Sequence, residues 1–152
     1  MPTPPQILII DARFYESIAD ELVAGAVAEI ETAGATQDNV SVPGVLEIPA
    51  ALSMALDSDA GRYQGYVLLG CVIRGETSHY DIVAGESARA VMDLAIGHKL
   101  ALGNGILTVE TDEQAWARAQ RGGKNKGGSA ARATLEMINL RARLRNPRIA
   151  NG

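Results

Sequence analysis

Apolar residues along the chain fall into short continuous runs that are separated by longer stretches with helical spacing. The continuous runs at residues 7–10, 66–73 and 106–109 are typical of strands that are buried on both faces of a sheet. Val40 and Val42 alternate with polar residues and predict a further short strand.

Helical periodicity predicts five helices between and after these strands. They cover residues 19–30, roughly 46–56, about 78–100, 112–119 and 130–144. Gly34 is expected to end the first helix, and the glycine-containing segment 103–105 is expected to end the third. Thr111 can cap the fourth helix, and the glycine-rich segment 121–128 is predicted to be a mobile loop before the last.

The order βαβαβαβαα favours a parallel sheet with right-handed crossovers. We therefore expect an α/β fold, a three-layer αβα sandwich around a four-stranded parallel sheet with flavodoxin-like strand order. A chain of 152 residues is long enough for one domain with its own core. We expect residues 1–152 to form that domain, with a flexible tail over residues 1–5.

Composition and charge exclude several classes of function. The net charge of −4 argues against binding to nucleic acid or to an anionic membrane, and the arginine-rich stretch from Arg132 to Arg148 is expected to be a solvated or interface face of the last helix. The chain has no signal-peptide pattern and no run of about 18 apolar residues, so we expect a cytoplasmic protein. The single cysteine, Cys71, lies in an apolar run and is expected to be a buried, unreactive thiol.

In parallel sheets of this kind ligands bind beyond the carboxyl ends of the strands, which here follow residues 10, 42, 73 and 109. The third junction, residues 74–79, offers a glycine, hydroxyl groups and the free amides of a helix start, which together suit a phosphate. The alternative is that Thr77 or Ser78 only caps the helix. Segments 70–77 and 122–129 both lack the lysine of a nucleotide-binding P-loop, so a nucleoside triphosphate is not expected.

Five side chains near these junctions are candidates for chemistry, and each has a structural alternative. His79 can transfer protons beside the anion site or be purely structural. Phe14 can stack on a flat ring or pack at the helix start. Glu47 can accept hydrogen bonds from the hydroxyls of a sugar chain or favour a helix start. Arg118 and Lys126 can bind a phosphate and a polar oxygen, or be ordinary surface charges.

Taken together, the junctions resemble one known family. The segments VPGVLEIP (42–49), GCVIRGETSHYD (70–81) and NKG (125–127) are similar to those of lumazine synthases, and the likeness extends over nearly the whole chain. The resemblance implies the condensation of 5-amino-6-ribitylaminopyrimidinedione with 3,4-dihydroxy-2-butanone 4-phosphate in riboflavin biosynthesis. The products are 6,7-dimethyl-8-ribityllumazine, inorganic phosphate and water, and neither a cofactor nor a metal is expected.

The resemblance also implies roles for the residues of these motifs, with His79 as the catalytic proton-transfer group. The implied substrate-binding residues are Phe14, Val45, Leu46, Glu47, Val72, Ile73, Gly75, Glu76, Thr77, Asn104, Arg118 and Lys126. Phe14 would stack on the pyrimidine, residues 45–47 would hold the ribityl chain, and the main chain of Ile73 would contact the ring. Residues 75–77 and Arg118 would bind the phosphate, and Lys126 would reach the pyrimidine.

The same resemblance implies a homo-oligomer, because Asn104, Arg118 and Lys126 would come from a neighbouring subunit. The sequence leaves open whether the assembly is a pentamer or a larger shell of pentamers. The chain departs from frequent family residues at Tyr15, Leu46, Asn104 and Ser129, and we expect these changes to alter ring contacts and affinity more than the reaction.

Two other functions fit parts of the pattern. A receiver-like signalling domain has a similar element order, but Arg74 and Gly75 stand where its acceptor aspartate would follow the third strand. A catalytically weak shell or ligand-carrier protein of the same fold would keep the assembly. The retained Glu47, His79 and Arg118 argue against that second alternative.

Overall fold

The computed structural model describes residues 3–58, 61–146 and 148, so the first two residues of the predicted tail lie outside the described part. The strands are β1 (Gln6–Ala12), β2 (Thr36–Val42), β3 (Gly65–Ile73) and β4 (Leu102–Val109). The helices are α1 (Glu16–Thr32), the short 3-10 helix η1 (Val45–Glu47), α2 (Ile48–Ser58), α3 (His79–Gly97), α4 (Asp112–Ala119) and α5 (Lys126–Leu144). The predicted element order is confirmed.

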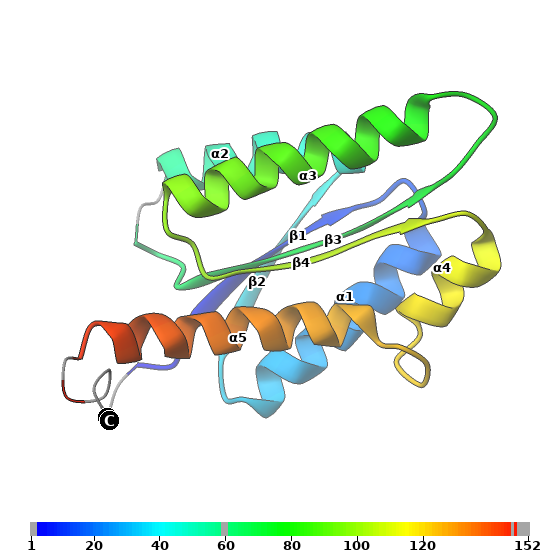
Figure 1. Cartoon of the computed structure of the whole chain (residues 1–152). Coiled ribbons are helices and arrows are strands. Elements are labelled where there is room, and N and C mark those ends of the chain that lie inside the picture. The colour runs from blue at the N-terminus through cyan, green and yellow to red at the C-terminus, as the bar shows by residue number, and fades with distance from the viewer. Residues whose placement is uncertain (1–2, 59–60, 147, 149–152) are drawn as a thin grey trace.

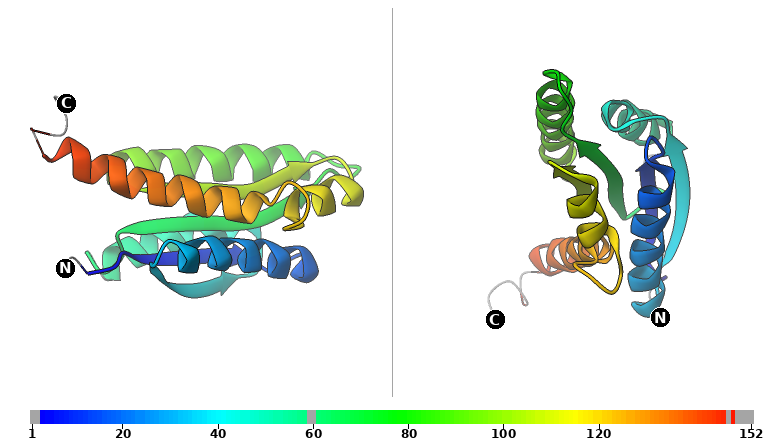
Figure 2. Two further views of the ribbon diagram at one scale, coloured as in Figure 1. Left: turned by 90° about the horizontal axis from the view of Figure 1, so that it is seen from below. Right: turned by 90° about the vertical axis from the view of Figure 1, so that its right-hand side faces the viewer.

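The four strands form one parallel sheet in the order β2-β1-β3-β4. Helices α2 and α3 cover one face of this sheet, and α1, α4 and α5 cover the other (Figure 1, Figure 2). The predicted three-layer sandwich is therefore confirmed. Within the described residues, no helix is long and apolar enough to cross a membrane.

Alternation along the central strands divides the apolar side chains into two cores. Ile7, Ile9, Val67 and Leu69 belong to the core beneath α1, α4 and α5, whereas the intervening residues of the same strands belong to the core beneath α2 and α3. Successive side chains of a strand point to opposite faces, so a strand that is apolar at every position must be covered on both. This explains the continuous apolar runs of the sequence.

The prediction that residues 103–105 end a helix is wrong, because Gly103 and Gly105 lie inside β4. A Cβ atom at Gly103 would overlap the carbonyl oxygen of Ala130 in α5. The glycines therefore allow α5 to lie directly on β4, which is a common reason for glycine within a strand. The buried hydroxyl of Thr134 in α5 donates a hydrogen bond of 2.8 Å to the carbonyl oxygen of Tyr66 in the neighbouring strand β3.

The predicted loop at 121–128 is shorter than expected, because α5 begins at Lys126. Asn125 precedes it in the left-handed conformation with φ 47°, and its side-chain oxygen accepts a hydrogen bond of 3.3 Å from the amide of Gly128. A Cβ atom at Gly127 would overlap the carbonyl oxygen of Leu22 in α1. The glycines that suggested a loop thus pack the first turn of α5 against α1.

Smaller differences concern the bounds of other elements. β2 begins at Thr36, earlier than the alternation of Val40 and Val42 predicted, and the third helix ends at Gly97. Thr111 caps α4 as predicted, because its hydroxyl accepts a hydrogen bond of 3.2 Å from the amide of Gln114.

Cys71 is buried in β3, as predicted, with 6% of its surface exposed. Removal from water disfavours the thiolate and raises the pKa of this thiol to about 12, and the negative charge of Asp112 adds to the shift. Since the thiolate is the reactive form, the side chain is held in its inert state.

We predict that Cys71 in the folded protein resists a thiol-specific reagent at pH 8 and reacts completely once the chain is unfolded in guanidinium chloride. A colorimetric thiol assay with and without denaturant measures this difference. Stoichiometric reaction of the folded protein would contradict the burial and the raised pKa.

We predict that Gly103→Ala destabilises the protein by about 1–3 kcal/mol, because α5 must move away from β4 to admit the methyl group. Gly85→Ala in α3 is the matched control, since a Cβ atom there would have no other atom within 4 Å and φ is not positive. Alanine in place of a helical glycine stabilises by roughly 0.5–1 kcal/mol. Denaturant unfolding at one protein concentration compares the two variants, and equal loss in both would refute the packing argument.

Candidate active site

The carboxyl ends of the four strands lie at one end of the sheet, where sequence analysis placed the chemistry. Ala12 pairs with Val42, and Ile73 pairs with Val109, so β1 ends level with β2, and β3 ends level with β4. β3 continues beyond its pairing with β1, which stops at Asp11 and Leu69. The loops that follow β1 and β2 therefore start side by side, as do those that follow β3 and β4. Parallel sheets with helices on both faces bind ligands at this end.

A pocket of about 320 Å³ opens at this end, between the β1–α1 junction, η1, the end of β3 and the start of α3. Its lining includes seven of the predicted site residues, namely Phe14, Val45, Leu46, Glu47, Val72, Ile73 and His79. We call it the aromatic pocket, after Phe14. Segments that are far apart in the sequence are thus brought together as the resemblance implied.

Phe14 is 74% exposed and meets the neighbouring Tyr15 ring edge-on, with 4.9 Å between ring centroids. Phe14 therefore contacts the start of α1 through Tyr15 and leaves most of its own ring exposed. An exposed phenyl ring at the mouth of a pocket offers a face on which a flat heterocycle can stack.

The segment between β3 and α3 is exposed from Gly75 to His79. The hydroxyl of Thr77 accepts a hydrogen bond of 3.3 Å from the amide of His79, the first residue of α3. Ser78 occupies the position before the helix but makes no capping hydrogen bond with its side chain. Nothing lies within 4 Å of the space beside Gly75, so an anion can approach the main chain there.

Three further predicted residues, Asn104, Arg118 and Lys126, line a second pocket of about 380 Å³ at β4, α4 and the start of α5, which we call the cationic pocket. Gly75, Glu76 and Thr77 line neither pocket. Arg118 donates a hydrogen bond of 3.1 Å to the carbonyl oxygen of Gln114, and Asn104 accepts one of 2.9 Å from the amide of Ile106. Lys126 is exposed at the first position of α5.

The aromatic and cationic pockets share no lining residue. β4 forms one edge of the sheet, and the cationic pocket lies along this strand, whereas the aromatic pocket lies over the ends of β1 and β3. A single chain therefore does not place Arg118 and Lys126 in the same cavity as Phe14 and His79.

Sequence reasoning did not assign several lining residues. They include Gly44, Cys71 and Val83 in the aromatic pocket and Thr108 and Ala133 in the cationic pocket. Tyr15 and Ser129, which the sequence marked only as departures from frequent family residues, also line the aromatic and the cationic pocket respectively. Tyr15 follows Phe14 directly, and its pKa is raised mainly by burial, with smaller electrostatic contributions from Cys71 and Asp112. The position of Tyr15 directly after Phe14 is the sequence feature that could have identified it as a pocket residue. Among the described residues, no group of His, Cys, Asp and Glu could hold a metal ion.

Comparison with known proteins identifies the family of this chain. The family model described as 6,7-dimethyl-8-ribityllumazine synthase matches residues 4–142. 6,7-Dimethyl-8-ribityllumazine synthase 1 of Rhizobium meliloti is 63% identical over 144 residues, which are 93% of this chain and 94% of that protein. The 6,7-dimethyl-8-ribityllumazine synthase of Agrobacterium fabrum is 59% identical, over 92% of this chain and 97% of that protein. The chain, with its family motifs gathered at one end of a parallel sheet, belongs to the 6,7-dimethyl-8-ribityllumazine synthase family.

Proposed function

We propose that this chain condenses 5-amino-6-ribitylaminopyrimidinedione with 3,4-dihydroxy-2-butanone 4-phosphate to give 6,7-dimethyl-8-ribityllumazine, a step of riboflavin biosynthesis. The observation that carries the proposal is the aromatic pocket, in which Phe14, the segment 45–47 and His79 meet at the carboxyl end of the sheet. The family match over residues 4–142 gives the reaction.

The reaction needs proton transfers and an anion site. The free amine of the pyrimidine attacks the ketone and forms an imine with loss of water. Loss of the proton on C3 of the butanone then expels inorganic phosphate from C4. The ribitylamino nitrogen closes the ring on the carbonyl that results, with loss of a second water. Each of these steps moves a proton to or from a nitrogen, oxygen or carbon atom, which is work for a general acid and base.

His79 is the residue we assign to these proton transfers. It lies at the first position of α3 and lines the aromatic pocket, directly after the exposed segment 75–77. An imidazole changes charge near neutral pH, so it can both accept and donate a proton within one cycle. We assign the phosphate to the main chain of residues 75–77, where the helix start offers amides and a favourable dipole.

We further propose that the complete site is shared by two chains, with the aromatic pocket of one facing the cationic pocket of its neighbour. A phosphate dianion is held best by charge-assisted hydrogen bonds. Arg74 is the cation nearest in sequence to the phosphate segment, and its guanidinium is occupied by Glu110 and Asp81. Arg118 and Lys126 of a neighbour would supply the missing positive charge, so we expect a homo-oligomer, either a pentamer or a larger shell of pentamers.

Other expectations stay predictions. They are the cytoplasmic location, the absence of nucleic-acid and membrane partners, and the choice between a pentamer and a larger shell. Light scattering on the purified protein distinguishes the last two by mass. The alternative of a catalytically weak carrier is tested by activity.

The direct test of the proposed activity mixes the purified protein with both substrates and follows the absorbance of the lumazine. We expect a rate that is proportional to protein concentration and well above the spontaneous rate. A rate equal to the spontaneous one would sink the proposal and favour the carrier.

We predict that Arg118→Ala and His79→Ala impair different steps. Loss of the Arg118 guanidinium should raise KM for the butanone phosphate by about 30-fold, the factor for a charge-assisted hydrogen bond of ~2 kcal/mol. Loss of the His79 imidazole should lower kcat by about 100-fold, with a milder effect on KM.

The control for both variants is Lys124→Ala, since Lys124 is exposed and lines neither pocket. Steady-state kinetics with each substrate varied in turn measure these effects. Wild-type constants in both Arg118→Ala and His79→Ala would refute the assigned roles.

A further inference from the structure

Arg13 and Arg74 occupy equivalent places in the fold, and neither is given a role by the proposed reaction. Each is the first residue after a strand, β1 for Arg13 and β3 for Arg74. The amide of each donates a hydrogen bond of 2.9 Å to the last carbonyl of a neighbouring strand, at Val42 and Val109 respectively. The residue that follows each arginine is a proposed substrate contact, Phe14 in one case and Gly75 in the other.

The guanidinium of Arg13 joins the end of β1 to helix α1. Its Nη1 lies 3.0 Å from Oδ2 of Asp11, and its Nη2 lies 2.6 Å from Oδ1 of Asp20. Asp11 is completely buried, and its second oxygen accepts a hydrogen bond of 2.9 Å from the hydroxyl of Ser41. A buried carboxylate with two fixed partners gives the bridge a rigid base.

The guanidinium of Arg74 joins the β3–α3 segment to its surroundings in the same way. Its Nε lies 3.0 Å from Oε2 of Glu110, which follows β4, and its Nη1 lies 3.5 Å from Oδ1 of Asp81 in α3. Its Cζ also lies 4.2 Å from the centroid of the Tyr80 ring, a cation–π distance. The start of α3 is thus tied to the loop after β4.

The two bridges share one spacing. The helix carboxylate stands seven residues after the arginine in both, Asp20 after Arg13 and Asp81 after Arg74. Each bridge therefore closes over the loop between a strand and its helix, and each loop carries a different half of the proposed site. Phe14 and residues 75–79 are exposed, so the bridge is one of the few contacts that hold each loop, beside the backbone hydrogen bonds to Val42 and Val109 and the packing of Tyr15 against the core.

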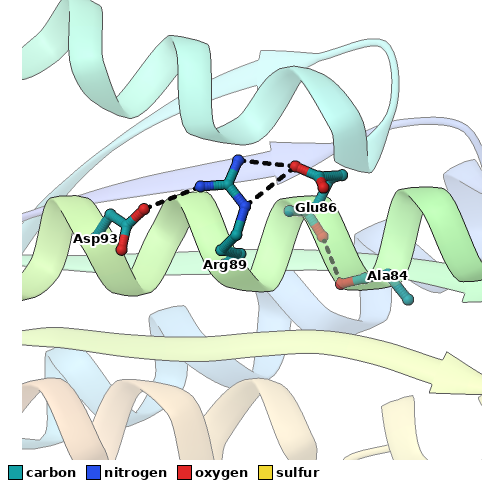
Figure 3. Close-up of polar contacts among 5 residues, drawn as sticks. Ala84, Glu86, Arg89 and Asp93 are labelled. Carbon is teal, nitrogen blue, oxygen red and sulfur yellow. Dashed lines mark hydrogen bonds and ion pairs between the residues drawn. The ribbon is translucent and has the colours of Figure 1, made fainter.

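Arg89 also bridges two carboxylates, but this bridge lies within one helix and holds no loop. It lies 2.8 Å from Glu86 and 3.0 Å from Asp93, but all three residues belong to α3 (Figure 3). This bridge runs along one helix and restrains no junction. It serves as a matched control for the other two.

We propose that Arg13 and Arg74 are positioning residues, and that each sets the loop for one substrate. Arg13 fixes the β1–α1 turn and with it the ring of Phe14, so it affects binding of the pyrimidine. Arg74 fixes the segment 75–79, so it affects binding of the butanone phosphate. The inference rests on the proposed function, because it assigns the two loops to the two substrates of that reaction.

The experiment measures KM for each substrate in Arg13→Lys and Arg74→Lys, with Arg89→Lys as the control. Lysine keeps the positive charge but lacks the planar fork that reaches two carboxylates at once. We expect Arg13→Lys to raise KM for the pyrimidine about fivefold and leave KM for the butanone phosphate within a factor of two, in line with one exposed ion pair. We expect the reverse for Arg74→Lys and no change in either constant for Arg89→Lys.

Two variants of the carboxylates that pair with these arginines distinguish a positioning role from direct contact with the substrate. If Arg74 held the phosphate with its charge, Glu110→Gln would remove a competing carboxylate and lower KM for the butanone phosphate. Positioning predicts that Glu110→Gln raises that KM and that Asp20→Asn raises KM for the pyrimidine. Asp20 is a surface residue, so Asp20→Asn also tests the β1 loop if Arg13→Lys folds poorly beside the buried Asp11.

The outcomes distinguish this inference from the proposed function. A wild-type protein without lumazine formation would defeat the proposed function itself. An active wild type in which both arginine variants change both KM values equally, or change neither, would overturn the inference alone. Thermal unfolding and light scattering on every variant exclude effects that arise from stability or assembly.

Discussion

Parallel pairing determines where every functional segment of this chain can lie. β1 pairs with β3, and β3 pairs with β4, all in the same direction, so their carboxyl ends meet at one end of the sheet. The same order leaves β4 at an edge, where Asn104 and the neighbouring helices α4 and α5 form the cationic pocket. One constraint thus gathers Phe14, Glu47 and His79 and at the same time separates them from Arg118 and Lys126.

Close packing of α5 gives the cationic pocket its shape. Gly103 lets this helix lie against β4, and Gly127 lets its first turn lie against α1. Lys126 lies between these contacts, at the start of the helix that Asn125 caps. The composition of residues 121–128 resembles that of a flexible linker, but a side chain at Gly127 would collide with α1. The position of Lys126, a proposed substrate contact, therefore depends on glycine at positions 103 and 127.

Local pattern in the sequence predicted most of the fold, and the family resemblance named most of the residues that line the aromatic pocket. The continuous apolar runs gave β1 and β3, and the motif around His79 gave the helix start beside the pocket. The start of β4 was missed because Gly103 and Gly105 signal a turn when their tertiary contact with α5 is unknown. The start of α5 was missed for the same reason. The separation into two pockets could not be predicted from the residues alone, since it depends on how α4 and α5 pack beside β4.

If the aromatic pocket of one chain and the cationic pocket of its neighbour form one active site, mixing two differently defective subunits restores activity. His79→Ala and Arg118→Ala chains are dissociated, mixed in equal amounts, reassembled and assayed for lumazine formation at a butanone phosphate concentration well below the wild-type KM, where both defects lower the rate. Random mixing should give about a quarter of the interfaces both intact halves, and so about a quarter of wild-type activity. Activity no higher than the mean of the two separately reassembled variants would contradict the account, because a site within one chain cannot be restored by a neighbour.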